Sequence, residues 1–297
     1  MLGVLLIFEL YIPNSLDDAL EFLAKYYPDA MPIAGGTELL ILIRDKKIRP
    51  KYLVDLSPLR RQFSYIKLEN GLVKIGALTT LWELSNSFLH NDVRYAGFQD
   101  VWHKFGTMSL RFMATIGGNI ATATDFSDYL VLLLAYDAKV KVSGVNGERV
   151  VPLGEFIVER RKPDLKPGEI ITEVFFTEPP LNTSSAFEKF DRRSILIAGL
   201  ANSAVYLHID NGRISDAKIS LDMIKEKRIP GRLRVLEESL KGREFSIEFI
   251  EKTIEETIPK HVEKYTDWWT TGDYRLEMTK TSIKKALLRA AKRIGVV

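Results

Sequence analysis

The sequence predicts an α+β protein of two domains, and three observations support this class. The chain has 297 residues, which is longer than most single domains. Its composition, with 46% hydrophobic and 27% charged residues, is that of a globular protein. Strand-like and helical segments alternate in the first half, whereas in the second half strands come first and helices follow. The order in the second half favours an antiparallel sheet covered by helices.

The first segments predict a strand–helix–strand unit. Leu2–Phe8 is a short apolar run without a basic leader, so it predicts a strand and not a signal peptide or a membrane span. A soluble, cytoplasmic protein is therefore expected. A helix is expected after Ser15, an N-cap residue followed by apolar residues at helical spacing. Met31–Ala34 predicts the next strand, and Leu39–Ile43 then continues as a helix or a strand.

The middle of the chain predicts further strands around a mostly helical stretch between Thr80 and Arg111. Asn146-Gly147 lies between two valine-rich runs and predicts a hairpin turn. Strands are expected at Lys51–Asp55, Leu72–Ala77, Val140–Val142, Val150–Val151 and Ile170–Phe176.

Pro179-Pro180, followed by Asn182–Ser185, is the best candidate for a linker between two domains. The segments beyond it predict three strands and then helices. The strands are expected at Ala186–Phe190, Ala201–Ile209 and Ile214–Leu221, and the helices between Pro230 and Val297.

The composition also excludes several functions. Lysine and arginine total 42 against 39 acidic residues, and a net charge of +3 does not indicate a nucleic-acid-binding protein. The chain has no cysteine, which excludes disulfides, thiolate metal sites, iron–sulfur ligation and a cysteine nucleophile within it. The four histidines show no metal-binding spacing, so no metal site is expected. The basic clusters Glu159–Lys162 and Lys225–Arg228 are interpreted as solvated surface.

Two glycine pairs are the candidates for ligand binding. Gly35-Gly36 and Gly117-Gly118 are each interpreted as ending an apolar strand, and a small polar residue follows each pair. Glycines let a pyrophosphate approach backbone N–H groups, which can form a concave anion site. Neither segment has the spacing of a Rossmann or Walker loop. The alternative is that both pairs are tight turns that hold no ligand.

Ala34–Thr37 together with Thr115–Gly118 resembles the paired FAD-pyrophosphate loops in the flavin-binding medium subunits of molybdenum hydroxylases. This family includes subunits of carbon monoxide dehydrogenase, xanthine dehydrogenase and archaeal glyceraldehyde oxidoreductase. The resemblance covers almost the whole chain, and the order and spacing of its motifs make it specific. The other motifs are Phe8–Pro13, Val54–Leu56, Ile75–Thr80, Gly118–Asp128, Pro167–Ile171, Lys189–Arg193 and Arg228–Gly242.

The resemblance implies a vanillyl-alcohol-oxidase-type FAD fold. Residues 1–178 would form the FAD-binding domain, with subdomains of about 1–56 and 57–178. Residues 184–297 would form a smaller α+β domain like the C-terminal domain of carbon monoxide dehydrogenase flavoproteins. The chain would pass electrons from an iron–sulfur subunit through the flavin to an acceptor, with no catalytic acid or base of its own. Its implied partners are a large molybdopterin subunit and a small subunit with 2Fe–2S clusters, in a dimer of heterotrimers.

The resemblance also implies which residues contact FAD. Phe105 and Ile171 would lie against the adenine, Asp128 would hydrogen-bond the cofactor, and Lys189 would approach the isoalloxazine. The pyrophosphate would lie against Pro32, Ile33, Ala34, Gly35, Gly36, Thr37, Glu38 and Leu39, and against Thr115, Ile116, Gly117, Gly118 and Asn119.

Each of the other assignments has a structural alternative. Phe105 could be an ordinary core aromatic residue, Asp128 could cap a helix, and Lys189 could be a solvent-facing strand residue. The sequence also departs from the family at two places. Met31 stands where many relatives carry a basic residue, and Leu196-Ile197 stands where an acid and then an aromatic residue or leucine would shield the flavin.

Two other functions stay open. The chain could be a free-standing FAD oxidoreductase of the same fold with its own substrate pocket, or a structural subunit that binds no cofactor. The absence of cysteine argues against the benzoyl-CoA-reductase branch, whose flavin subunit carries an added iron–sulfur loop.

Overall fold

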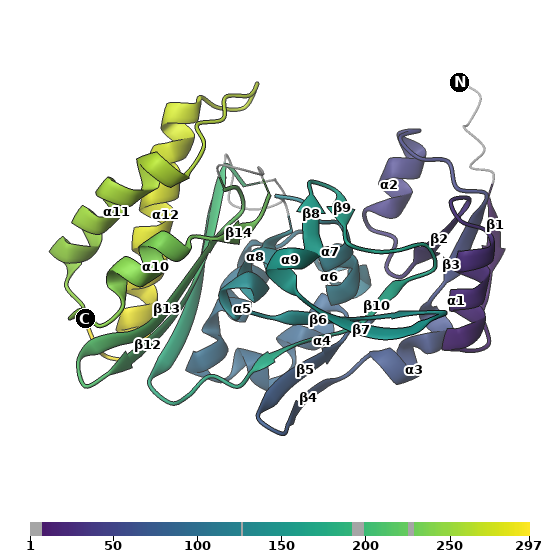
Figure 1. Ribbon diagram of the computed structural model, residues 1–297, viewed down its shortest axis with the longest axis horizontal. Coiled ribbons are helices and arrows are strands. Elements are labelled where there is room, and N and C mark those ends of the chain that lie inside the picture. The colour runs from purple at the N-terminus through teal and green to yellow at the C-terminus, as the bar shows by residue number, and fades with distance from the viewer. Residues whose placement is uncertain (1–7, 126, 192–198, 225–228) are drawn as a thin grey trace.

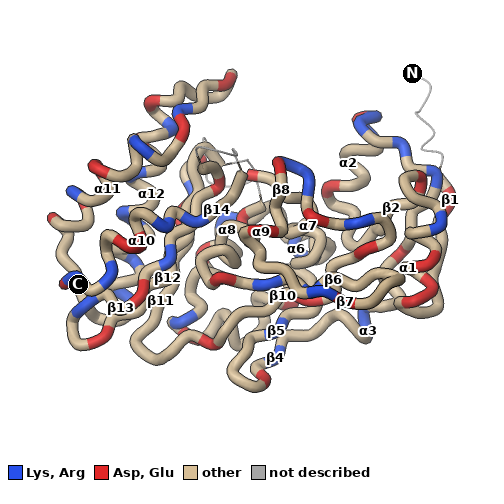
Figure 2. The backbone as a smooth tube through the Cα atoms, in the orientation of Figure 1, with Lys and Arg blue, Asp and Glu red and all other residues tan. Residues whose placement is uncertain are grey.

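The structure is a computed structural model that describes residues 8–125, 127–191, 199–224 and 229–297. The three larger sheets follow one another across the molecule, with the N-terminal sheet at one end and the C-terminal helices at the other (Figure 1). Acidic and basic residues are interspersed along the chain (Figure 2). No helix in these ranges has the length and apolar character needed to cross a membrane.

A small parallel sheet opens the described chain, in the order β1-β3-β2. It consists of β1 (Glu9–Tyr11), β2 (Ala30–Ile33) and β3 (Tyr52–Asp55). Helix α1 (Leu16–Lys25) begins where it was predicted, because the Ser15 hydroxyl accepts a hydrogen bond from the Asp18 N–H. The segment after the first glycine pair is a helix, α2 (Leu39–Arg44). Residues 1–7 of the expected first strand lie outside the described residues.

A five-stranded antiparallel sheet, in the order β4-β5-β10-β6-β7, forms the middle of the molecule. Strands β6 and β7 form the predicted hairpin, but its turn is Val145-Asn146, and Gly147 already pairs with Gly144 as the first residue of β7. The strands are β4 (Ile66–Glu69), β5 (Leu72–Gly76), β6 (Lys139–Gly144), β7 (Gly147–Pro152) and β10 (Ile170–Thr177). A separate hairpin consists of β8 (Ile157–Glu159) and β9 (Lys162–Pro163).

Short helices surround this sheet. The stretch from Thr80 to Arg111 is mostly helical, as expected. The α-helices are α3 (Arg60–Phe63), α4 (Leu81–Ser85), α5 (Ala96–Lys104), α6 (Met108–Met113), α7 (Ile116–Ala121), α8 (Asp128–Ala135) and α9 (Leu153–Phe156). The 3-10 helices are η1 (Ser57–Leu59), η2 (Phe88–His90) and η3 (Val93–Tyr95).

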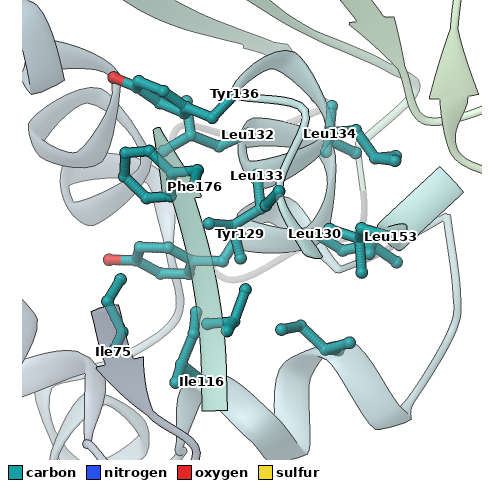
Figure 3. Close-up of a cluster of buried hydrophobic side chains, with 14 of the residues drawn as sticks. Ile75, Ile116, Tyr129, Leu130, Leu132, Leu133, Leu134, Tyr136, Leu153 and Phe176 are labelled. Atoms are coloured by element: carbon teal, nitrogen blue, oxygen red, sulfur yellow. The ribbon is translucent and has the colours of Figure 1, made fainter. Parts of the chain in front are cut away.

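Helix α8 lies at the centre of the largest apolar core. All of its residues are buried, which explains the continuous apolar run Tyr129–Ala135. Figure 3 shows Tyr129, Leu130 and Leu133 of this helix among Ile116, Leu153 and Phe176 from the surrounding elements. Because each fully buried side chain of this size contributes roughly 1.5–3 kcal/mol, the core holds α8 firmly in place. The carboxyl group of Asp128, at its first turn, is therefore held inside the protein.

The C-terminal part is a four-stranded antiparallel sheet, β11-β12-β13-β14, followed by helices. Its strands are β11 (Thr183–Phe190), β12 (Ala201–Asp210), β13 (Arg213–Leu221) and β14 (Gly231–Arg232). Its helices are α10 (Arg234–Leu240), α11 (Ile247–His261) and α12 (Gly272–Arg293). The predicted order of strands and then helices is confirmed, and only the short β14 was not expected.

This sheet is buried on both faces. Along β11, Ala186 belongs to the core under α10–α12, whereas Phe187 belongs to the core around α8. Strand β11 begins inside the expected linker, because Thr183–Ser185 are buried strand residues. The Ser185 hydroxyl accepts hydrogen bonds from the Gly97 N–H and the Tyr136 hydroxyl, which satisfies a polar group that sequence alone assigns to a loop.

Candidate functional site

The first glycine pair lies against the turn that leads to the second. Gly35 is packed so tightly that a Cβ atom there would lie 1.8 Å from the Met113 carbonyl oxygen and 2.6 Å from its carbonyl carbon. Gly36 needs glycine for its conformation, because its φ is +68°. The backbone contact at Gly35 thus places Pro32–Leu39 beside the segment that precedes Thr115.

The second glycine pair differs from the expectation. Gly117 and Gly118 do not end a strand but form the first turn of α7, with Thr115 as the N-cap. The Thr115 hydroxyl accepts from the Gly118 N–H at 3.2 Å, and the Gly117 N–H donates to the Ala77 carbonyl oxygen at 2.9 Å. A Cβ atom on Gly117 would lie 2.7 Å from the Ala77 Cβ atom. Gly117 therefore makes room for Ala77 and not for a ligand. Because the N–H groups of Gly117 and Gly118 already donate to acceptors in the protein, they are not free to bind an anion.

The first loop does offer free donors. The N–H groups of Gly35, Gly36, Thr37 and Glu38 donate to no acceptor within the described part of the chain, and the loop is half-buried. Successive N–H groups of this kind form an anion site.

An unpaired acceptor belongs to the neighbouring helix α7. Asn119 Oδ1 is buried and has no hydrogen-bond partner among the described residues. A buried acceptor without a partner is costly unless a bound molecule or water supplies a donor. The free donors of the first loop and this acceptor fit FAD, whose pyrophosphate accepts hydrogen bonds and whose hydroxyl groups donate them.

The β8–β9 hairpin connects the first loop to the segment before α8. The Arg161 guanidinium lies 2.6 Å from a Glu38 carboxylate oxygen, and the Arg160 guanidinium lies 2.7 Å from Asp125. The Arg161 N–H also donates to the Ala123 carbonyl oxygen. The interpretation of Glu159–Lys162 as solvated surface is therefore incomplete (Figure 2). Because these ion pairs are partly exposed, each contributes about 1 kcal/mol at most, and their main effect is to position the loop.

Asp128 and Lys189 form a buried ion pair. The Lys189 Nζ atom lies 2.8 Å from Asp128 Oδ2, and the side chains are 5% and 2% exposed, respectively. The Asn202 side-chain amide donates to the other Asp128 oxygen at 3.2 Å. Burial raises the pKa of Asp128, and the charge of Lys189 opposes this rise.

Both structural alternatives for this pair are wrong in detail. Ser127, not Asp128, is the N-cap residue of α8. Lys189 faces the protein interior and not the solvent, because α8 covers this face of the C-terminal sheet. Nothing in the local sequence indicated that Asn202 would join the pair.

The two residues expected near the adenine lie at the edge of the α8 core. The Phe105 ring is half-buried, and its centre is 5.8 Å from that of Tyr129. Ile171 is buried on β10, beside a bulge between Ile171 and Glu173. The position of Phe105 is compatible with its core alternative, and the bulge beside Ile171 is a feature often found beside binding sites. The departure at Leu196-Ile197 lies outside the described residues, and Met31 lies on β2 before the first loop.

A cleft of about 320 Å³ opens where the segment before α8, the end of β13 and the turn between α11 and α12 converge. Its aromatic side chains suit a flat ring system. It is lined by Asp125, Arg160, Gly199, Met223, Tyr265, Asp267, Trp268, Trp269 and Arg275.

Comparison with known proteins identifies the family. Residues 6–179 match the family described as the FAD binding domain in molybdopterin dehydrogenase, and residues 185–290 match the CO dehydrogenase flavoprotein C-terminal domain. The chain is 30% identical over 254 residues to the nicotinate dehydrogenase FAD-subunit of Eubacterium barkeri, covering 83% of this chain and 84% of that protein. It is 28% identical to the glyceraldehyde dehydrogenase medium chain of Sulfolobus acidocaldarius, covering 94% and 96%.

The fold agrees with this assignment. A chain in a solved structure of carbon monoxide dehydrogenase from Hydrogenophaga pseudoflava superimposes with a TM-score of 0.90 and 26% identity, covering 97% of this chain and 98% of that one. A chain of a Cu,Mo-CO dehydrogenase in its cyanide-inactivated form also gives a TM-score of 0.90, with 27% identity and coverage of 96% and 98%. The resemblance found in the sequence is confirmed, and the chain belongs to the family of FAD-binding subunits of molybdenum hydroxylases.

Proposed function

We propose that this chain holds FAD between the first glycine loop and the Asp128–Lys189 ion pair. The observation that carries the proposal is the row of free N–H groups from Gly35 to Glu38, next to the segment that leads to the unpaired Asn119. The proposed contacts are Pro32–Leu39, Thr115–Asn119, Phe105, Asp128, Ile171 and Lys189.

Within this site, each group of residues has a different task. The free N–H groups of the first loop hold the negative charge of the pyrophosphate. The Lys189 ammonium, fixed by Asp128, would supply a positive charge near the bound ring, and the surrounding apolar core would exclude water. FAD supplies the electron-transfer chemistry when it is bound. The chain itself supplies binding, orientation and electrostatics, as expected for the electron-transfer subunit of a molybdenum-dependent dehydrogenase.

The partner subunits carry the other cofactors. Relatives are named as FAD-subunits or medium chains, which implies further subunits in their complexes. A cysteine-free chain cannot ligate iron–sulfur clusters, so a small 2Fe–2S subunit and a large molybdopterin subunit would supply them. The finer proposals are a dimer of heterotrimers in the cytoplasm, with residues 1–178 as the FAD-binding domain and residues 184–297 as the C-terminal domain.

The test separates this proposal from the two alternatives. We expect mass spectrometry of the cofactor released from the purified chain to identify FAD. We also expect that the chain does not turn over aldehydes or purines until the molybdenum and iron–sulfur subunits are added. Release of FMN, or no flavin after reconstitution, contradicts the FAD site and favours a structural subunit. Turnover of an organic substrate by the isolated chain at enzyme-like rates favours a free-standing oxidoreductase instead.

A further inference from the structure

A second buried carboxyl group is connected to the Asp128–Lys189 pair through Asn202. Asp222 follows β13 and is 4% exposed. Its carboxylate accepts a hydrogen bond from the Asn202 N–H at 3.0 Å, and its own N–H donates to the Asn202 carbonyl oxygen at 3.1 Å. Because the Asn202 side chain also donates to Asp128, this one residue connects the two buried carboxyl groups.

The charged groups around Asp222 come from several elements. Asp125 precedes α8 and Asp128 begins it, while Arg275 lies on α12. Arg275 already pairs with Asp267 at 2.8 Å, and Lys189 on β11 pairs with Asp128. Within the described ranges, no cation forms an ion pair with Asp222.

This environment disfavours the ionised form of Asp222. Burial is the largest cause, and the negative charge of Asp125 is the next, and together they raise the pKa of Asp222 to about 8. The Asn202 N–H and Arg275 oppose the rise, whereas Asp128 adds to it. At pH 7 this carboxyl group is therefore mostly protonated.

We propose that Asp222 is a positioning residue that binds a proton when the bound flavin is reduced, and that it acts through Asn202 on the Asp128–Lys189 pair. The inference rests on the proposed FAD site. An ionised Asp222 adds negative charge next to Asp128 and weakens the positive field of Lys189. The reduced flavin carries more electron density than the oxidised flavin, so it is bound less tightly while Asp222 is ionised.

The proton balance follows from this coupling. When an external reductant adds two electrons to the bound FAD at a pH where Asp222 is ionised, the Asp222 carboxylate takes up a proton from the solvent. The flavin takes up its own protons on reduction at every pH, and at lower pH the Asp222 carboxyl group already holds its proton and takes up no further one. Reduction and protonation at Asp222 therefore favour each other, as thermodynamic linkage requires.

The experiment compares the wild type with Asp222→Asn, which imitates the protonated carboxyl group. Asp216→Asn is the matched control, because Asp216 lies on β13, the strand that Asp222 follows, and is partly exposed. Each FAD-loaded protein is titrated anaerobically with a reductant and reference dyes between about pH 6 and pH 9.5, which spans the expected pKa. The titration gives the ratio of the Kd values for reduced and oxidised FAD.

Above pH 8 we expect the ratio of the Kd for reduced FAD to the Kd for oxidised FAD to rise in the wild type. The rise should approach about tenfold for each pH unit when it is compared with Asp222→Asn at the same pH. Asp216→Asn should follow the wild type. If Asp222 only holds the Asn202 N–H, the wild type and Asp222→Asn have the same pH profile, and the inference is refuted.

Two further outcomes remain decisive. If Asp222→Asn does not fold, the inference is tested on the wild type alone. The ratio of the Kd values must then change its pH dependence near pH 8. A profile without that change overturns the inference. A chain that binds no FAD contradicts the proposed function, whereas a chain that binds FAD without this pH dependence contradicts only the coupling through Asp222.

Discussion

Replacing Lys189 by methionine leaves the buried carboxylate of Asp128 without its cation. Breaking a buried ion pair in this way costs about 3–5 kcal/mol. The cost has an upper limit, because Asp128 can take up a proton instead. From its ordinary pKa of 3.8, protonation at pH 7 costs about 4 kcal/mol. Since Asn202 still donates to Asp128, we expect a loss of about 3 kcal/mol in the free energy of unfolding.

The pH dependence of this loss gives a second check. Without Lys189, burial holds the pKa of Asp128 above its unfolded value, so the folded variant binds a proton that the unfolded chain has released. The destabilisation of Lys189→Met therefore grows as the pH rises above the unfolded pKa, and it disappears at acidic pH, where both states are protonated. Denaturant unfolding at several pH values measures it.

A double-mutant cycle shows whether the two residues act as a pair. We expect Asp128→Asn combined with Lys189→Met to be more stable than Lys189→Met alone, by about 2 kcal/mol, since no charge remains buried. Additive effects, or a loss below about 1 kcal/mol for Lys189→Met, would refute the argument from burial. If the folded double variant still binds FAD like the wild type, the pair has a structural task only.

Two further predictions concern Asn119 and Asp100. Asn119→Ala removes the buried unpaired acceptor, and we expect the Kd for FAD to rise about tenfold. The control Asn91→Ala changes an exposed residue and should leave the Kd unchanged. Equal Kd values for Asn119→Ala and the wild type would contradict a contact between Asn119 and FAD. Asp100→Ala removes the acceptor of the Phe187 N–H at 3.0 Å and of Arg293 at 2.7 Å. We expect Asp100→Ala to lower the free energy of unfolding by about 3 kcal/mol, because Arg293 is only 23% exposed and would lose its anionic partner. A loss below about 1 kcal/mol in denaturant titrations would contradict this expectation.

The parts of the fold predicted correctly depend on local chemistry. The Ser15 hydroxyl caps α1 through a local hydrogen bond, and Asn146-Gly147 predicted the hairpin from turn chemistry alone, although the turn itself is Val145-Asn146. The second glycine pair was predicted as the end of a strand, because the requirement for glycine there comes from Ala77, a residue far away in sequence. Periodicity cannot reveal a contact of this kind.

The candidate site was predictable only in part for the same reason. Lys189 alternates with apolar residues and locally resembles a solvent-facing strand position. It is buried because α8 and α12 cover opposite faces of the C-terminal sheet, which depends on tertiary packing. Asn202 and Asp222 have no sequence pattern that suggests a site. Their importance follows only from the hydrogen bonds that connect them to Asp128.

The C-terminal sheet completes the candidate site by neutralising two acidic residues of the preceding segment. Asp100 on α5 is bound by Arg293 and the Phe187 N–H, and Asp128 on α8 is bound by Lys189 and Asn202.

Apolar contacts accompany these polar ones. Phe187 and Tyr206 share the core around α8, and the Tyr206 ring lies 5.9 Å from that of Tyr136. Without the sheet, the segment that matches the FAD-binding domain would keep two acidic groups without these partners and an exposed apolar surface, each of which opposes stable packing. Docking of the sheet is therefore what stabilises α5 and α8 in their positions. Because that same docking fixes the ammonium of Lys189, the charge at the proposed flavin site depends on the C-terminal part of the chain.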